Sequence, residues 1–172
     1  MQLTVQKLTS TSLAATNKLY ISIPDFTTLR NPKYVLANTM VYVVESHKDV
    51  PQGVLWTNSP QRNSINAAIG EKADVKPYVP GDAEQSTTRV VFSVGLFELK
   101  PTTVEAKDLR EYMKANFTNH IFTKGQQLLF PINGTIFKFV VTEVDSVTAS
   151  GDVVKGASRG LLHPRIESID FE

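Results

Sequence analysis

The sequence predicts a mixed fold in two parts, a small β-barrel followed by an α+β unit, and three observations carry this prediction. Short β-type runs separated by turn residues fill the first half. A polar run with two prolines and a Pro-Gly pair, residues 77–88, interrupts that pattern. The second half combines an amphipathic helix with the strongest two-residue hairpin signal, Asn133-Gly134.

In the first half, four apolar runs have the length of short strands. Residues that favour turns lie between them, such as Pro24-Asp25 and Asn58-Ser59-Pro60. Strands this short and this evenly spaced favour a barrel, and no long helix is expected in this half. The four runs are Leu19 to Ile23, Tyr34 to Leu36, Met40 to Val44 and Val54 to Thr57.

Residues 77–88 read PYVPGDAEQSTT and show no hydrophobic periodicity. This composition predicts a linker between two domains, which we place at residues 1–84 and 85–172. The same run would also fit a long surface loop inside a single domain.

The second half is expected to open with a strand and a helix. The strand, Arg89 to Leu99, is apolar on both faces, which is typical of a buried central strand. Thr102 and Glu105 have the spacing of a capping box and predict a helix start at Thr102. The apolar face of that helix repeats at helical spacing. It consists of Leu109, Tyr112, Met113 and Phe117.

A hairpin follows the helix. Asn133-Gly134 joins the apolar segments Gln126 to Ile132 and Thr135 to Val141, and both turn residues tolerate positive φ. Two further runs, Val144 to Ala149 and Ile166 to Phe171, are expected to close the sheet, with Ser150 to Gly160 as a loop between them.

Composition excludes several classes of function. A formal net charge of +1, from 18 basic and 17 acidic residues, argues against a whole-protein electrostatic grip on nucleic acid or on an anionic membrane. The absence of cysteine excludes disulfides and thiolate metal sites and fits the cytosol. No run approaches the roughly 20 apolar residues of a membrane span, so we expect a soluble, unanchored chain.

The residues that could take part in catalysis match no known metal-binding or nucleotide-binding motif. His47, His120 and His163 lack a second ligand at metal spacing. The segment Gly151 to Ser158 has the glycine spacing of a P-loop, but Ala157 stands where the phosphate-binding lysine is required.

Two carboxylates, Glu143 and Asp145, lie two residues apart and have the spacing of a paired acid, although solvated strand-edge charges are far commoner. We expect no catalytic residues, no metal and no cofactor site in this chain.

Two motifs are specific enough to suggest a family: Pro60-Gln61-Arg62, and the run from Phe122 to Leu128, which has the form Phe-x-x-Gly-Gln-Gln-Leu. With them, the chain resembles over nearly its whole length the N domain of N-ethylmaleimide-sensitive factor (NSF), the ATPase that disassembles SNARE complexes with SNAP adaptors. The other matched residues are Leu13, Thr16-Asn17, Asp25-Phe26, Val50-Pro51, Gly53, Ser59, Ile69-Gly70, Phe130, Phe137 and Phe171-Glu172.

The resemblance implies a double-psi β-barrel followed by an α/β roll, with a groove between them. It also implies a binding module that couples SNAP and its SNARE complex to the ATPase ring. ATP and Mg²⁺ would be bound by ATPase modules that this chain lacks. We therefore expect a non-enzymatic monomer, part of a homohexamer in the full-length protein, cytoplasmic and peripheral to membranes through SNAP and SNARE.

In the family, SNAP recognition is attributed to basic residues that meet an acidic adaptor surface. The match is incomplete: Pro101 replaces the second base of a basic pair, and Asn63 stands where relatives often carry another base. Binding would then be weaker, or shifted onto the helix. The candidate SNAP-binding residues are Arg62, Lys100, Lys7, Lys107 and Arg110.

Two other functions stay open. Valosin-containing protein and its relatives have N domains of the same architecture, which recruit ubiquitin-linked cofactors largely by apolar contacts in the interdomain groove. A third reading treats the barrel as a small-molecule active site, but the sequence offers no set of nucleophile, base and metal for it.

Overall fold

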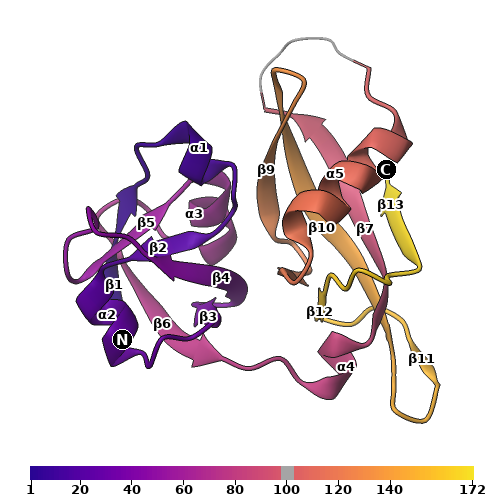
Figure 1. Cartoon of the computed structure of the whole chain (residues 1–172), viewed down its shortest axis with the longest axis horizontal. Coiled ribbons are helices and arrows are strands. Elements are labelled where there is room, and N and C mark those ends of the chain that lie inside the picture. The colour runs from indigo at the N-terminus through magenta and orange to yellow at the C-terminus, as the bar shows by residue number, and fades with distance from the viewer. Residues whose placement is uncertain (98–102) are drawn as a thin grey trace. The chain divides into compact units, whose positions relative to one another are not determined.

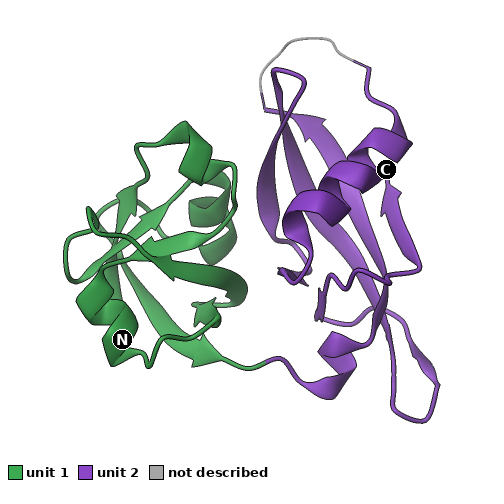
Figure 2. Ribbon diagram, viewed as in Figure 1, with its two compact units in different colours: residues 1–79 green, residues 80–172 purple. Residues whose placement is uncertain are grey.

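The computed structural model describes residues 1–97 and 103–172, so Lys100 and Pro101 lie outside the described residues. The chain forms two compact units, Met1–Val79 and Pro80–Glu172 (Figure 2). This division falls before the boundary placed at Glu84, because the short helix α4 (Asp82–Gln85) contacts strand β12 (Arg159–Leu161) of the second unit.

Unit 1 is a closed six-stranded barrel with strand order β1-β5-β2-β4-β3-β6, and β6 pairs back onto β1 (Figure 1). The pairs β1–β5 and β2–β4 are parallel and the others antiparallel, so the barrel closes through crossover connections. The expected double-psi barrel fold is confirmed. The strands are β1 (Gln2–Lys7), β2 (Leu19–Ile21), β3 (Tyr34–Ala37), β4 (Met40–Ser46), β5 (Val54–Thr57) and β6 (Lys72–Tyr78).

Two of these strands are absent from the sequence-based prediction. Strand β1 has a polar composition, yet Leu3 and Val5 alternate into the core and are fully buried. Strand β6 begins at the charged Lys72 and continues through Pro77 to Tyr78. The predicted linker 77–88 contains the division between the two units, and it also holds the end of β6, helix α4 and the start of β7 (Thr87–Leu96).

Short helices start at the two predicted turns, Pro24-Asp25 and Asn58-Ser59-Pro60. Helix α2 (Ile23–Thr28) is capped by Ser22, whose hydroxyl accepts a hydrogen bond from the backbone N–H of Asp25. Helix α3 (Ser59–Ile65) begins with a capping box in which Asn58 and Gln61 bind each other's backbone N–H groups. Both helices carry proline in the first turn, where its missing N–H costs nothing. A third helix, α1 (Thr11–Ala14), has four residues.

Unit 2 is an α/β roll in which helix α5 covers a sheet ordered β11-β10-β7-β13, with β9 also paired to β10. Strand β7 lies between β10 and β13, so its prediction as a central strand is confirmed. A separate pair is formed by β8 and β12. The remaining elements are α5 (Ala106–Phe117), β8 (Ile121–Thr123), β9 (Gln127–Ile132), β10 (Thr135–Val147), β11 (Val153–Val154) and β13 (Ser168–Phe171).

Helix α5 starts later than its sequence signal indicates. Glu105 is the N-cap residue, so it cannot occupy the third helical position of a capping box that begins at Thr102, and Thr102 lies outside the described residues. The predicted apolar face is confirmed: Leu109, Met113 and Phe117 are buried against the sheet.

The hairpin β9–β10 turns at Asn133-Gly134 as predicted, with φ of 49° and 78° at the two residues. Strand β10 continues to Val147, so the run expected to start a separate strand at Val144 belongs to it. The segment expected as a loop, Ser150 to Gly160, holds β11 and the first residues of β12.

Candidate functional site

Arg62 lies on helix α3, and the structure fixes its guanidinium against the barrel. Its Nη1 donates a hydrogen bond to the carbonyl oxygen of Thr57 at 2.8 Å and lies 3.4 Å from the Thr57 hydroxyl. Partial burial lowers the pKa of Arg62 below its ordinary value, but an arginine remains charged at neutral pH. The charge is therefore held in one place rather than on a freely rotating side chain.

Lys7 reaches the same neighbourhood from the other end of the sequence. In the parallel pairing of β1 with β5, the Cα partner of Lys7 is Thr57. The next residue, Leu8, donates its N–H to the Thr57 carbonyl at 2.9 Å, the oxygen that Arg62 also binds. Lys7 is exposed. The structure thus brings the backbone positions of two predicted site residues together around Thr57, which is itself buried.

The charge of the chain is distributed unevenly between the units. Residues 1–79 contain eight Lys and Arg against five Asp and Glu, a surplus of three positive charges. Residues 80–172 contain ten against twelve, a deficit of two, and together these give the net charge of +1. Lys7 and Arg62 therefore lie in the positively charged unit, which favours an acidic partner there.

An open surface hollow of about 730 Å³ adjoins Arg62. It is formed by the carboxyl-terminal half of α3 and the segment that leads to β6. Its lining mixes one base, one acid, two amides and three apolar side chains. These are Arg62, Glu71, Asn63, Asn66, Ala67, Ala68 and Ile69.

The other candidates lie in unit 2 or outside the described residues. Lys107 is exposed on α5, with its Nζ 3.9 Å from a carboxylate oxygen of Glu111 one turn on. Arg110 donates its Nε–H to the carbonyl oxygen of Ile169 at 2.8 Å and so ties α5 to β13. These two form a second basic position, on one helix, while Lys100 falls in the segment that is not described.

Comparison with known proteins finds similarity to a family model and to a vesicle-fusing ATPase. The family model "Cell division protein 48 (CDC48), domain 2" matches residues 103–157, within unit 2. A vesicle-fusing ATPase of Arabidopsis thaliana is 27% identical over 171 residues, which covers 94% of this chain. The resemblance to the vesicle-fusing ATPase N domain is confirmed. The chain spans 22% of the length of that relative.

Several residues that carry the resemblance to vesicle-fusing ATPases have structural roles. The buried carboxylate of Asp25 accepts hydrogen bonds from the Ser22 hydroxyl and from the N–H of Gly53, both at 2.7 Å. Gln61 is fully buried and donates to the carbonyl of Lys18 at 3.0 Å. In the Pro-Gln-Arg motif, Pro60 thus lies in the first turn of α3, Gln61 holds the helix against the barrel, and Arg62 follows as the charged residue.

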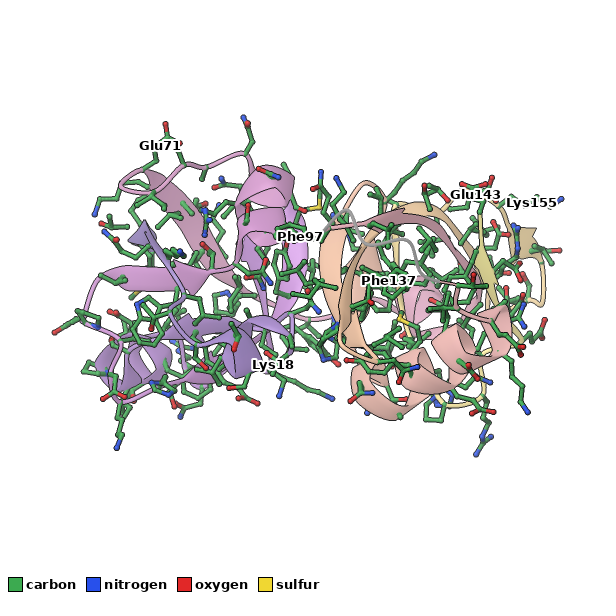
Figure 3. All side chains as sticks on the ribbon, turned by 90° about the horizontal axis from the view of Figure 1, so that it is seen from above. Lys18, Glu71, Phe97, Phe137, Glu143 and Lys155 are labelled. Atoms are coloured by element: carbon green, nitrogen blue, oxygen red, sulfur yellow. The ribbon has the colours of Figure 1, made fainter. Side chains whose placement is uncertain are left out.

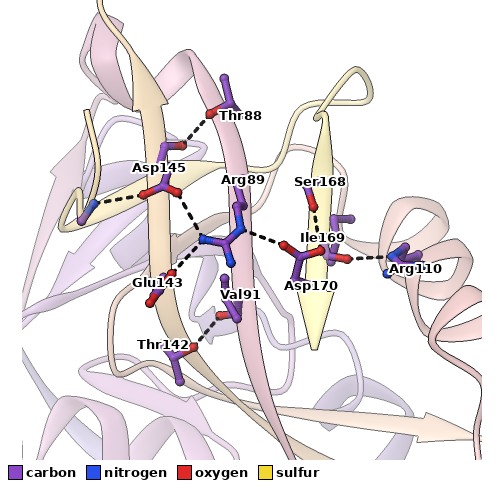
Figure 4. Close-up of polar contacts among 11 residues, drawn as sticks. Thr88, Arg89, Val91, Arg110, Thr142, Glu143, Asp145, Ser168, Ile169 and Asp170 are labelled. Carbon is purple, nitrogen blue, oxygen red and sulfur yellow. Dashed lines mark hydrogen bonds and ion pairs between the residues drawn. The ribbon is translucent and has the colours of Figure 1, made fainter. Parts of the chain in front are cut away.

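The two carboxylates singled out in the sequence belong to an ion-pair network and not to a paired acid. Arg89 of β7 binds Glu143 at 2.8 Å and Asp145 at 3.3 Å, both on β10, and binds Asp170 of β13 at 2.7 Å (Figure 4). One guanidinium therefore links three neighbouring strands, and its hydrogen bonds raise the pKa of Arg89 above its ordinary range. Figure 3 shows Glu143 and Lys155 on the surface of this unit.

This network predicts a stability change in acid. The hydrogen bond from Arg89, followed by that from Ser168, lowers the pKa of Asp170. A carboxyl whose folded-state pKa is lowered stabilises the fold above its unfolded pKa of about 3.9, and this contribution is lost as the pH falls through the lower folded value. Between pH 6 and pH 2, the free energy of unfolding should therefore fall less in Asp170→Asn than in the parent chain, as measured by urea denaturation.

The matched control for this experiment is Glu167→Gln, which removes an exposed carboxylate from the same segment. It should leave the acid-induced decrease of the parent chain unchanged. An equal decrease in Asp170→Asn and in the parent would show that the Arg89 pair does not contribute.

Within the described ranges, none of the helices has the length and apolar character that a membrane crossing requires. Among the same residues, no group of three or more His, Cys, Asp or Glu side chains is placed to hold a metal ion.

Proposed function

We propose that this chain is a non-enzymatic recognition module that binds an acidic surface of a SNAP adaptor through Lys7 and Arg62, coupling the adaptor and its SNARE complex to an ATPase ring. The observation that carries the proposal is the convergence of these two residues at Thr57 in the positively charged unit. The similarity to a vesicle-fusing ATPase over 94% of the chain supports the choice of partner.

The geometry suits an interface that forms and is released in each cycle. A surplus of positive charge raises the rate of encounter with an acidic surface, and exposed charge pairs give modest, salt-sensitive affinity. Because the Thr57 carbonyl already orients the Arg62 guanidinium, less side-chain entropy is lost when a carboxylate binds to it. Lys107 and Arg110 offer a second basic position for another part of the adaptor.

The remaining parts of the proposal concern the whole protein. ATP and Mg²⁺ would bind in ATPase modules outside this chain, which would also form the homohexamer, and this region alone would be a monomer. Contact with membranes would be peripheral and cytoplasmic, made through SNAP and the SNARE complex. The held guanidinium of Arg62 and the exposed Lys7 support a protein partner with an acidic surface rather than a small-molecule substrate.

The test is binding of this chain to SNAP assembled on a SNARE complex, at low and at physiological salt. The double reversal Lys7→Glu with Arg62→Glu should weaken binding at low salt at least about tenfold, because several adaptors in one complex amplify weak single contacts. Affinity of the parent chain should fall as salt rises, and the variant should lose most of this salt dependence.

The control is Lys33→Glu with Lys48→Glu, which changes the net charge equally at two exposed lysines of the same unit. It should retain most of the binding. Thermal unfolding of each variant checks that the barrel is intact, which is needed because Arg62 also binds the backbone. Equal losses in both double variants would contradict a localised site.

The match to the CDC48 model supports testing a second partner class, the ubiquitin-linked cofactors that valosin-containing protein recruits. Salt-insensitive binding to those cofactors, in the absence of binding to SNAP, would replace the SNAP proposal with this alternative.

A further inference from the structure

An isoleucine next to Arg62 is held in solvent by a rigid segment. Ile69 is 53% exposed and lies in the segment between α3 and β6. That segment is fixed to β1: the N–H of Gly70 donates to the carbonyl of Val5, and the N–H of Val5 donates to the carbonyl of Glu71, both at 2.8 Å. The exposure of Ile69 is therefore built into the fold and does not come from a loose loop.

Ile69 and Arg62 line the same hollow of about 730 Å³, together with Ala67 and Ala68. A partner that occupied the hollow would cover an apolar surface while one of its carboxylates reached the guanidinium. Burial of an aliphatic side chain is favourable, so even partial burial here adds to the charge contacts.

The charges of the lining restrict the occupant further. Glu71 is also part of the hollow, and its Oε2 accepts a hydrogen bond from the N–H of Ala68 at 2.7 Å. Figure 3 shows Glu71 at the outer edge of unit 1. A negative group at this edge opposes a compact, multiply charged anion such as phosphate. A peptide segment can place one carboxylate on Arg62 and keep its other acids away from Glu71.

We propose that this hollow receives an apolar side chain that is flanked by a carboxylate in an acidic segment of the adaptor. The identity of the adaptor rests on the function proposed above, whereas the apolar contact and its residues come from the hollow itself. Lys7 and Arg62 would supply the salt-sensitive part of the interaction, and the exposed side chains of Ile69 and Ala68 would supply a salt-insensitive part.

The chain provides a matched control. Ile23, the first residue of α2, is 54% exposed and belongs to the same unit, but it does not line the hollow. The variants Ile69→Ser and Ile23→Ser therefore remove the same side chain, at almost equal exposure, from different places. Neither is buried enough for its loss to unfold the barrel, which thermal unfolding verifies.

The experiment uses two synthetic acidic peptides, each with four glutamates, that differ only in a central leucine or serine. Isoleucine methyl resonances are followed by NMR during titration of the full chain. The leucine peptide should shift the Ile69 methyl signals but not those of Ile23, and should bind about fivefold more tightly than the serine peptide. In Ile69→Ser the two peptides should bind equally, while Ile23→Ser should behave as the parent.

Equal affinity of the two peptides for the parent chain, or equal behaviour of the two serine variants, would overturn the inference. Failure of both peptides to bind would overturn it as well. The assay with assembled SNAP separates this from the function itself: loss of binding on charge reversal, with no effect of Ile69→Ser, keeps the basic site and removes the apolar contact. No binding of the parent chain to SNAP removes the proposed partner.

Discussion

Replacing Phe130 with alanine is expected to lower the free energy of unfolding of unit 2 by about 4 kcal/mol. Phe130 is fully buried on β9, and its ring lies 4.4 Å from that of Phe139 and 4.6 Å from that of Phe117, measured between centroids. It therefore joins helix α5 to the sheet. Truncation removes these ring contacts, together with that to Tyr112, and leaves a cavity at the centre of the aromatic core.

Hydrogen exchange at the amides of Phe139 and Val141 measures this loss, because both lie in strand pairs at the core of unit 2. The single tryptophan, Trp56, belongs to β5 and gives a separate fluorescence signal for unit 1. The control is Phe97→Ala, where the ring is 46% exposed and the expected cost is below about 1 kcal/mol. Similar costs for the two variants would contradict the aromatic core described above.

The second large effect is expected for Gly160→Ala on β12. A Cβ at this position would lie 2.2 Å from the Thr87 Oγ1 atom and 2.7 Å from a Val144 methyl carbon, and both neighbours are buried. The Thr87 hydroxyl is also held by a hydrogen bond to the Glu84 carbonyl at 2.8 Å. Because neither side chain can move away freely, we expect a loss of about 2–3 kcal/mol in the free energy of unfolding.

Gly95→Ala is the matched control for Gly160→Ala, since a Cβ there meets only the Lys138 carbonyl oxygen, at an ordinary 3.7 Å. This variant should be close to neutral in urea denaturation. A Gly160→Ala variant that unfolds at the same urea concentration as Gly95→Ala would show that β12 does not pack as closely as the structure indicates.

Local patterns in the sequence predicted the elements whose stability is itself local. The hairpin at Asn133-Gly134, the apolar face of α5 and strand Val54–Thr57 all follow from short-range rules. Strand β1 could not be found this way, because its two inward residues are flanked by polar ones and its pairing partners are about fifty and seventy residues away. The helix start at Asn58 did carry a readable signal, the Asn-x-x-Gln spacing with a proline inside it.

In the candidate site, too, some features followed from the sequence and others depend on long-range strand pairing. A resemblance in sequence indicated Lys7 and Arg62, but only the parallel pairing of β1 with β5 places both at Thr57. Ile69 is one of the residues that carry the resemblance, but neither it nor Asn66 was predicted as a contact, because no local pattern marks an exposed binding residue there. Their relevance depends on how the chain after α3 returns to β1, which is a property of the closed barrel.

The closed barrel has a consequence for how a nascent chain acquires its structure. Strand β1 precedes all other strands of unit 1 in the chain, yet its partners are β5 and β6. Thr4 can therefore pair only after Val54 has been synthesised, and Gln2 only after Asp74. Pairing over such separations requires large loops to close first, which makes folding slow compared with locally connected domains. During synthesis, unit 1 is thus expected to stay incomplete until Tyr78 has left the ribosome, and its apolar strands remain exposed for that period.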